Sequence, residues 1–198
     1  PMTKIRSLKP GETYCYLYVS REEADQFLYS YFKQGLDKNE KSIYVDPDHN
    51  GRSFTGLLAH NGIDVEEATK SERLLLKSID KGAGIAATLK GLTDASEGSP
   101  ENLSRIAVND TDSLKKPGRN WFSHIAEDLR PIINERSFCV FMYCIEGVSP
   151  EAVFNLLAVF PSLIIGDEIY DNVLLPDHAL VTQSESQAVD ASHFLELI

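Results

Sequence analysis

The sequence predicts an α/β protein, a three-layer α/β/α sandwich with a mainly parallel central sheet. Two runs of strand length, residues 14–19 and 138–145, are apolar or aromatic at nearly every position, which is typical of strands buried on both faces. Apolar side chains spaced three and four apart in residues 24–36 predict a helix that packs on the sheet. Strand-like and helix-like stretches alternate along the chain, and this pattern favours a parallel sheet covered by helices.

The first helix and the strand after it set the direction of the sheet. Ser20 occupies the place of a helix N-cap, and two glutamates follow it in the first turn, where the helix dipole favours negative charge. The helix is therefore expected to begin near Arg21, with Gly35 and Asn39 ending it. A short strand at residues 42–45 completes a strand–helix–strand crossover, whose connection is nearly always right-handed and whose strands are parallel.

The rest of the chain repeats this alternation with weaker signals. Further strands are expected at residues 74–77, 105–108 and 163–165. Further helices are expected at residues 54–60, 65–71, 121–133 and 151–160. Residues 80–102 are rich in glycine, and only residues 85–92 within them could support a helix. That segment is read either as a surface excursion or as a lid over a pocket.

Composition indicates one domain with an acidic surface. With 198 residues and 42% hydrophobic content, the chain can bury one sizeable core. We expect an N-terminal extension at residues 1–10, in which Pro1 is a residue left by tag removal, a domain at residues 11–176, and a tail or linker toward an output domain at residues 177–198.

The charge balance limits the partners of the protein. Nineteen basic and thirty acidic residues give a formal net charge of −11, which opposes binding to phosphate backbones and to anionic membranes. Neither nucleic acid nor membrane is therefore an expected direct partner. The sequence has no apolar run of membrane-spanning length and no charged-then-apolar leader, so a cytoplasmic location is expected.

The connection after the first strand, residues 19–23, cannot form a phosphate-binding loop. It contains no glycine or lysine and carries two carboxylates, whereas a phosphate cradle needs glycines, a lysine for the outer phosphates and a hydroxyl for magnesium. ATPases of the RecA and KaiC kind have such a loop at this place. They also have an acidic residue after a later strand, where this sequence has Asp110. Without the loop, Asp110 is more simply a helix cap or a loop hydrogen-bonding residue.

Four stretches of the sequence resemble the MEDS domain, a sensory domain named from methanogens, methylotrophs and the regulator DcmR. They are residues 11–18, the phrase QGLDKNEKSIYV, the phrase NGIDVEEATKSERLLL and the phrase FPSLIIGDEIYDN. The resemblance implies a RecA/KaiC-like fold without the ATPase motif, a role in sensing small hydrocarbon derivatives, and a kinase or transcriptional output protein. Family members often open with Gly-x-His-x-Cys, whereas Thr13 stands here at the histidine position, so no role of that histidine is carried over.

Candidate ligand-binding residues follow from a general rule for open α/β sheets. Ligands bind beyond the carboxyl ends of the strands, near the point where the strand order reverses. The rule selects Tyr18, Ser20, Arg21, Asn109, Asp110, Trp121, Tyr143 and Cys144, with Asp46, His49 and Glu146 at neighbouring strand ends. Tyr18, Ser20, Tyr143 and Cys144 are expected to line one concavity with Asn109 and Asp110 beside it, suited to a neutral or weakly polar ligand. Each of these residues also has a simpler reading as core, capping or exposed side chain.

The sequence offers no metal or cofactor motif. The three cysteines, Cys15, Cys139 and Cys144, lack zinc spacing, and no two of the five histidines have the i, i+4 spacing of a helical metal site. Buried thiols acting as small apolar side chains are the favoured interpretation, and a redox or metal sensor is the alternative. Residues 139 and 144 are five apart, which on a strand places them on opposite faces.

Three functions follow, in decreasing order of support. The first is a non-catalytic sensory domain that binds a small organic ligand and acts through an attached or associated output protein. The second is an inert RecA-like module for protein–protein contact, which would include assembly into homo-oligomers. The third is an enzyme with Asp110 or Glu146 as base, and it ranks last because no nucleophile–base–orienter set is visible.

Overall fold

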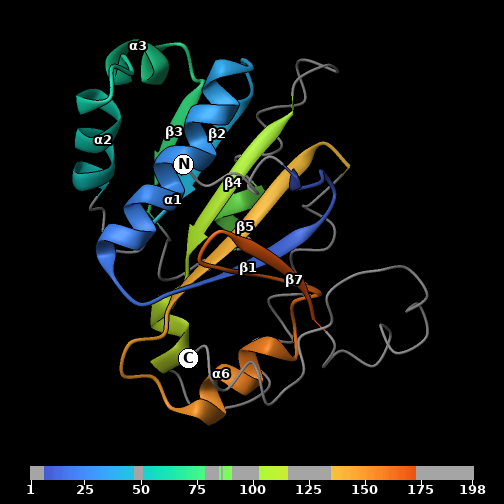
Figure 1. Ribbon diagram of the computed structural model, residues 1–198. Coiled ribbons are helices and arrows are strands. Elements are labelled where there is room, and N and C mark those ends of the chain that lie inside the picture. The colour runs from blue at the N-terminus through green and yellow to red at the C-terminus, as the bar shows by residue number, and fades with distance from the viewer. Residues whose placement is uncertain are drawn as a thin grey trace.

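A seven-stranded sheet in the order β3-β2-β4-β5-β1-β6-β7 forms the centre of the protein (Figure 1). The computed structural model describes residues 7–46, 51–78, 85, 87–90, 103–115 and 135–172. The strands are β1 (Thr13–Tyr18), β2 (Lys41–Val45), β3 (Leu74–Lys77), β4 (Ser104–Asn109), β5 (Ser137–Cys144), β6 (Ser162–Ile165) and β7 (Glu168–Asp171). All neighbouring pairs are parallel except β6 with β7, so the predicted mainly parallel sheet is confirmed.

Helices cover both faces of this sheet. They are α1 (Arg21–Asp37), α2 (Gly51–His60), α3 (Val65–Lys70), the 3-10 helix η2 (Thr111–Lys115) and α6 (Pro150–Leu157). In Figure 1, α1 and α2 (blue and teal) lie on one side of the sheet and α6 (orange) on the other. Residues 85 and 87–90 of the predicted helix 85–92 are helical, and the predicted helix 121–133 lies outside the described residues. None of the described helices has the length and apolarity that crossing a bilayer requires.

The alternation of side chains along β1 divides the core into two. Tyr14, Tyr16 and Tyr18 point toward α1, whereas Cys15 and Leu17 point toward α6. The α1 side is strongly aromatic, and the ring centroids of Tyr16 and Phe27 are 4.0 Å apart in a stacked arrangement. A side chain on a neighbouring strand position therefore belongs to the other half of the core. This division decides which predicted site residues can meet.

Helix α1 begins as predicted and ends differently. The Ser20 hydroxyl accepts a hydrogen bond from the backbone N–H of Glu23, so the helix begins at Arg21. At the other end, Asn39 adopts a left-handed φ of 60° just after the cap. Gly35, however, lies inside the helix and does not end it. A Cβ at this position would lie 2.7 Å from Cδ of Arg105, so the glycine is needed because α1 passes close to a buried arginine.

Arg105 is a charged residue near the amino end of the interior strand β4, buried beneath α1. Its Nε donates to the carboxylate of Glu40, and the side chains of the two residues are only 2% and 6% exposed. The guanidinium also lies 4.4 Å from the ring centroid of Phe138 and 5.2 Å from that of Tyr31. Gly35 and Glu40 both belong to the phrase QGLDKNEKSIYV. These two residues of the phrase therefore hold Arg105 near the amino ends of the strands.

The antiparallel strand β7 was not predicted. It forms a two-residue hairpin with β6 through Gly166, which has a positive φ of 61°, and Asp167. Asn172, directly after β7, is buried, and its side-chain amide donates to the Phe160 carbonyl over 2.6 Å. A Gly-Asp pair between two short runs is itself a hairpin signal. The last predicted strand ended at residue 165, so the edge strand of the sheet was missed.

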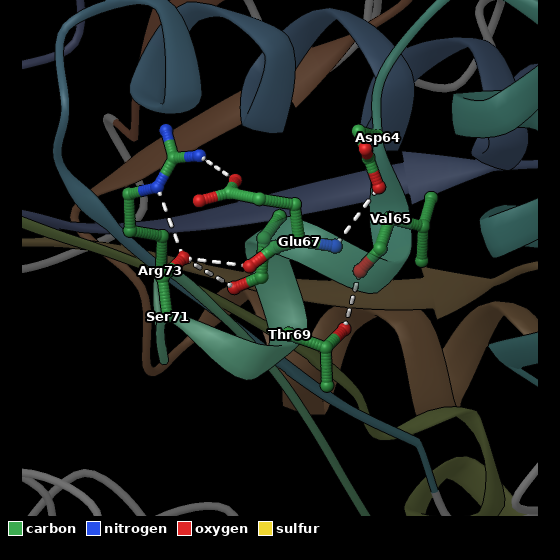
Figure 2. A network of polar contacts seen from close by, with 7 residues as sticks. Asp64, Val65, Glu67, Thr69, Ser71 and Arg73 are labelled. Carbon is green, nitrogen blue, oxygen red and sulfur yellow. Dashed lines mark hydrogen bonds and ion pairs between the residues drawn. The ribbon is translucent and has the colours of Figure 1, made fainter.

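The short helix α3 is held by its own side chains (Figure 2). Asp64 Oδ1 accepts from the backbone N–H of Glu67 over 2.9 Å at the start of the helix. Within the helix, the Thr69 hydroxyl donates to the Val65 carbonyl over 2.7 Å. After it, Arg73 forms an ion pair with Glu67. Such local bonds add to the few apolar contacts of this six-residue helix, in which Ala68 is the one buried residue.

Candidate functional site

The strand order reverses between β1 and β5. The chain leaves β1 through α1, on one face of the sheet, and leaves β5 through α6, on the other face. The two strands are parallel neighbours, with Tyr18 opposite Cys144 at their carboxyl ends, and the backbone N–H of Ile145 donates to the Tyr18 carbonyl over 2.9 Å. Connections that diverge in this way open a crevice beyond the strand ends, which is where ligands of such sheets bind.

Aromatic and polar side chains gather at this edge on the α1 side of the sheet. We call this group the edge cluster: Tyr18, Arg21, Tyr44, Asp46, Asn109, Thr111 and Cys144. The Tyr44 hydroxyl donates to Oδ2 of Asp46 over 3.3 Å, and Asp46 is only 4% exposed. The positive charge of Arg21, in the first turn of α1, interacts with the side chains of Tyr44 and Asp46. Arg21 also forms an ion pair with Asp25 at 3.1 Å. Sequence reasoning missed Tyr44, because at the end of β2 it selected only residues after the strand, Asp46 and His49.

Thr111 connects three strand ends within the edge cluster. Its hydroxyl donates to Oδ1 of Asn109 over 3.0 Å and accepts from the backbone N–H of Cys144 over 2.9 Å. The same oxygen lies 3.3 Å from the Tyr18 hydroxyl. The ends of β4, β5 and β1 therefore meet at one side chain. Sequence reasoning reached Asn109 and Asp110 and stopped one residue short, although a hydroxyl just after a strand end is itself a hydrogen-bonding signal.

The tyrosines of the edge cluster are hydrogen-bond donors at neutral pH. Burial raises the pKa of Tyr18, and the charges of Cys144 and Asp46 act in the same direction, whereas Thr111 and Arg21 lower it. Burial also raises the pKa of Tyr44, and the nearby Asp46 carboxylate adds to the effect. Both phenols therefore stay protonated, and a ligand can donate to a phenolic oxygen or accept a phenolic proton in place of Asp46 or Thr111.

The side chains of Ser20 and Glu23 occupy the region around the N-terminus of α1. Glu23 Oε2 accepts from the backbone N–H of Val19 over 3.0 Å, while Ser20 accepts from the Glu23 N–H over 3.2 Å. This pair resembles a capping box, except that the glutamate accepts from the N–H of the residue before the N-cap. It places a carboxylate where a phosphate group would otherwise meet the helix dipole and the free amides. Ser20, predicted to contact a ligand, is thus engaged in capping.

The expected single concavity is divided by the sheet, and this corrects the predicted geometry. Tyr143 is fully buried on the α6 side, whereas Tyr18 and Cys144 lie on the α1 side. The Tyr143 hydroxyl donates to Oδ2 of Asp110 over 3.0 Å, and the Ser113 hydroxyl donates to Oδ1 of the same carboxylate. Burial raises the pKa of Tyr143, and the Asp110 charge adds to it. Neighbouring residues on one strand face opposite ways, so Tyr143 and Cys144 cannot line the same face of the sheet.

The remaining predicted positions are placed as follows. Glu146 is exposed in the turn after β5. Trp121 and His49 lie outside the described residues. Cys15 and Cys139 are fully buried on the α6 side, where burial raises the pKa of both thiols, and Cys144 is partly exposed on the α1 side. Cys139 and Cys144 thus lie on opposite faces, as predicted. Within the described ranges, His, Cys, Asp and Glu side chains nowhere group in threes that could hold a metal ion.

Comparison with known families assigns the chain. Residues 14–159, from β1 to just beyond α6, match the family described as the methanogen/methylotroph, DcmR sensory domain (MEDS). The chain belongs to the MEDS family. The resemblance found in the sequence is thereby confirmed, and the match includes the whole edge cluster of this MEDS domain. No curated protein matches the chain.

Solved structures show the fold to which this MEDS domain is similar. A KaiC-like protein (PH0186) from Pyrococcus horikoshii OT3 aligns with a TM-score of 0.60 at 12% identity, over 79% of this chain and 71% of that one. A structural-project protein (PH0250) from the same organism aligns with a TM-score of 0.57 at 13% identity, over 96% of this chain and 99% of that one. At these identities the likeness concerns the fold alone, and the predicted RecA/KaiC-like fold is confirmed.

Proposed function

We propose that this MEDS domain binds a small neutral or weakly polar organic molecule at the edge cluster, and that occupancy biases an attached or associated output, kinase or regulator protein. The observation that carries the proposal is the position of the cluster at the reversal of strand order. There, two protonated phenols, an amide and a hydroxyl lie beside aromatic core. A few convergent polar groups in an aromatic surround are the usual composition of a small-molecule site.

The charges at this edge support a neutral ligand rather than an anion. The Glu23 carboxylate accepts from the backbone N–H of Val19 beside the start of α1, and the Asp46 carboxylate lies beside Tyr44. The guanidinium of Arg21 is already paired with Asp25. An anion approaching the edge cluster would be repelled by these carboxylates, in a chain whose formal net charge is −11.

We propose that the domain is not an enzyme. The buried contacts of Asp110 with Ser113 and Tyr143 resemble a hydroxyl–carboxylate pair, yet all three side chains lie in the α6-side core, away from the edge cluster. A hydroxyl nucleophile needs a base oriented by a third group and access to substrate. The simpler role of Asp110 is to fix the start of η2.

A second function is favoured by one observation, an exposed aromatic side chain on α6. Phe154 is 40% exposed on the outer side of that helix. Exposed aromatic residues mark protein contact sites when they belong to a larger apolar surface. Under this alternative the domain is an inert RecA-like interaction module that assembles with itself or with another protein.

Thermal unfolding across a panel of small neutral organics, small organic anions and Mg-ATP tests the first function. A ligand at 100 times its dissociation constant stabilises the native state by about 2.7 kcal/mol, which for a domain of this size shifts the midpoint by about 5–10 °C. We expect a shift with one or more neutral compounds and none with Mg-ATP.

Matched phenylalanine variants locate the effect. Tyr18→Phe and Tyr44→Phe should weaken the shift, because each removes a donor from the edge cluster. Tyr170→Phe, the same change on β7 away from the cluster, should leave it intact. Midpoints that no compound raises, together with a concentration-dependent increase in mass that Phe154→Ser abolishes, would favour the interaction module instead.

A further inference from the structure

The segment from Asn109 to Leu114 makes contacts on both faces of the sheet. On the α1 side, the Thr111 hydroxyl contacts Asn109, the Tyr18 hydroxyl and the backbone of Cys144 at 2.9–3.3 Å. On the α6 side, the next residue back, Asp110, has its carboxylate bound by the hydroxyls of Ser113 and Tyr143. One turn of chain thus joins the edge cluster to the opposite half of the core.

On the α6 side of the sheet, the contacts of this segment extend to helix α6. Leu114 belongs to the same apolar cluster as Val153, Leu156 and Leu157 of α6. The Tyr143 ring, whose hydroxyl holds Asp110, meets the ring of Phe160 edge-on at a centroid distance of 6.0 Å. Figure 1 shows η2 beside the carboxyl end of β5, on the side where α6 lies.

We propose that Thr111 is the positioning residue through which occupancy of the edge cluster reaches η2 and α6. The inference rests on the proposed function, since it names how the signal leaves the same site. A ligand that bonds to Tyr18, or that displaces Cys144, competes for partners of the Thr111 hydroxyl. We then expect α6, whose surface carries the exposed Phe154, to change when the edge cluster is occupied.

The segment from Asn109 to Leu114 is suited to transmit a displacement of Thr111 because hydrogen bonds restrict the movement of its backbone. The backbone N–H of Asp110 donates to the Met142 carbonyl over 3.1 Å, and that of Ser113 donates to the Asp110 carbonyl over 2.9 Å. Asp110 and Ser113 are both buried, where bonds between polar groups are strong and costly to leave unmade. A displaced Thr111 must therefore move Asp110 and Leu114 with it.

A covalent probe can stand for the ligand. Cys144 is partly exposed, whereas Cys15 and Cys139 are fully buried. Methyl methanethiosulfonate therefore adds one methylthio group at Cys144, beside Thr111, as a mass of the intact protein can verify. Amide hydrogen exchange, measured with and without the label, then reports on each helix separately.

The expected result is a change in the exchange rates of η2 and α6 on labelling of about fivefold or more, the lower end of typical coupling between sites. In Thr111→Val the same label should change exchange near Val19 and the start of α1 but leave α6 unchanged. Thr111→Ser, which keeps the hydroxyl, should restore the response of α6. Thr69→Val removes a hydroxyl that bonds only within α3 in the described contacts and should respond as the native protein does.

Two outcomes would overturn the proposal. One is an α6 response of equal size in Thr111→Val, and the other is an unchanged α6 in the labelled native protein. Because the label is attached covalently, neither outcome depends on whether a natural ligand binds at the edge cluster. A failed compound panel with an intact α6 response would instead reject the proposed function and leave the coupling in place.

Discussion

At the scale of single residues, Arg105 explains features of the sequence that had other readings. A charged side chain in a central strand must be paired when it is buried, and Glu40 supplies the opposite charge. Gly35 leaves room for its aliphatic stem, since a Cβ there would meet Cδ of Arg105 at 2.7 Å. Gly35 and Glu40, both in the phrase QGLDKNEKSIYV, therefore act at the amino end of the sheet. The proposed ligand site lies at the other end and includes Tyr44, near the end of the phrase, and Asp46, just after it.

We expect Gly35→Ala to destabilise the protein by up to about 2 kcal/mol. Overpacking of a well-filled interior costs about 1–3 kcal/mol, and alanine's better helix propensity returns about 1 kcal/mol of that. Arg105 cannot swing away at low cost because Glu40 and two aromatic rings hold its guanidinium. Urea unfolding of the purified variant measures the difference.

Gly56→Ala is the matched control for that substitution. Gly56 lies inside α2 with nothing within 4 Å of a Cβ built on it. The same change should therefore stabilise the protein by about 0.5–1 kcal/mol through helix propensity alone. Opposite signs at the two positions support the packing argument. Equal stabilisation at both would mean that Arg105 has room that the structure does not show.

At the scale of elements, the loop after β1 and the start of α1 form one unit. The side chains of Ser20 and Glu23 accept from the backbone N–H groups of Glu23 and Val19, and the Ser20 cap fixes where the helix begins. Ser20→Ala should reduce the free energy of unfolding by about 1 kcal/mol, the usual cost of losing a side-chain cap. Chemical denaturation measures it, with Ser149→Ala at the corresponding cap of α6 for comparison. An unchanged midpoint for Ser20→Ala would show that the cap contributes nothing to α1.

The sequence predicted most elements because their signals are local. Continuous apolar runs and a helix with regular spacing identified β1, β5 and α1, and the cap at Ser20 set the helix start correctly. The antiparallel β7 was missed because four half-exposed residues carry little hydrophobic pattern. Tertiary contacts could not be predicted either, because they join residues that are far apart in the sequence. The role of Gly35 depends on Arg105, which is 70 positions later in the chain.

The candidate site was predictable in location and only partly in composition. The rule for strand ends selects Tyr18, Asn109 and Cys144, which the edge cluster brings together. The rule ignores the side-chain alternation along a strand, so it also selected Tyr143 from the opposite face. Thr111 was passed over because its importance comes from three strand ends meeting, and their order in the sheet cannot be read from local patterns.

At the scale of the whole molecule, tyrosine is the residue that most distinguishes the two halves of the core. Of the buried tyrosines, Tyr14, Tyr16, Tyr18, Tyr31 and Tyr44 lie in the α1 half and Tyr143 lies in the α6 half. Burial is the largest cause of a raised pKa in all six. The folded protein therefore keeps phenolic protons that the unfolded chain would lose in alkaline solution. Folding and tyrosine ionisation are thus linked across the entire sheet.

The last prediction is that the free energy of unfolding falls as the pH rises above about 10, the ordinary pKa of tyrosine. Below that pH both states hold the phenolic protons, so these groups cause no change. Above it, the unfolded chain ionises while the fully buried Tyr16, Tyr31 and Tyr143 do not. Each then lowers stability by up to about 1.4 kcal/mol per pH unit. Urea unfolding between pH 9 and 11 should show this slope, and tyrosinate absorbance of the native protein should stay below that of all eight tyrosines. Full ionisation in a protein that keeps its circular dichroism would contradict the burial on which the prediction rests.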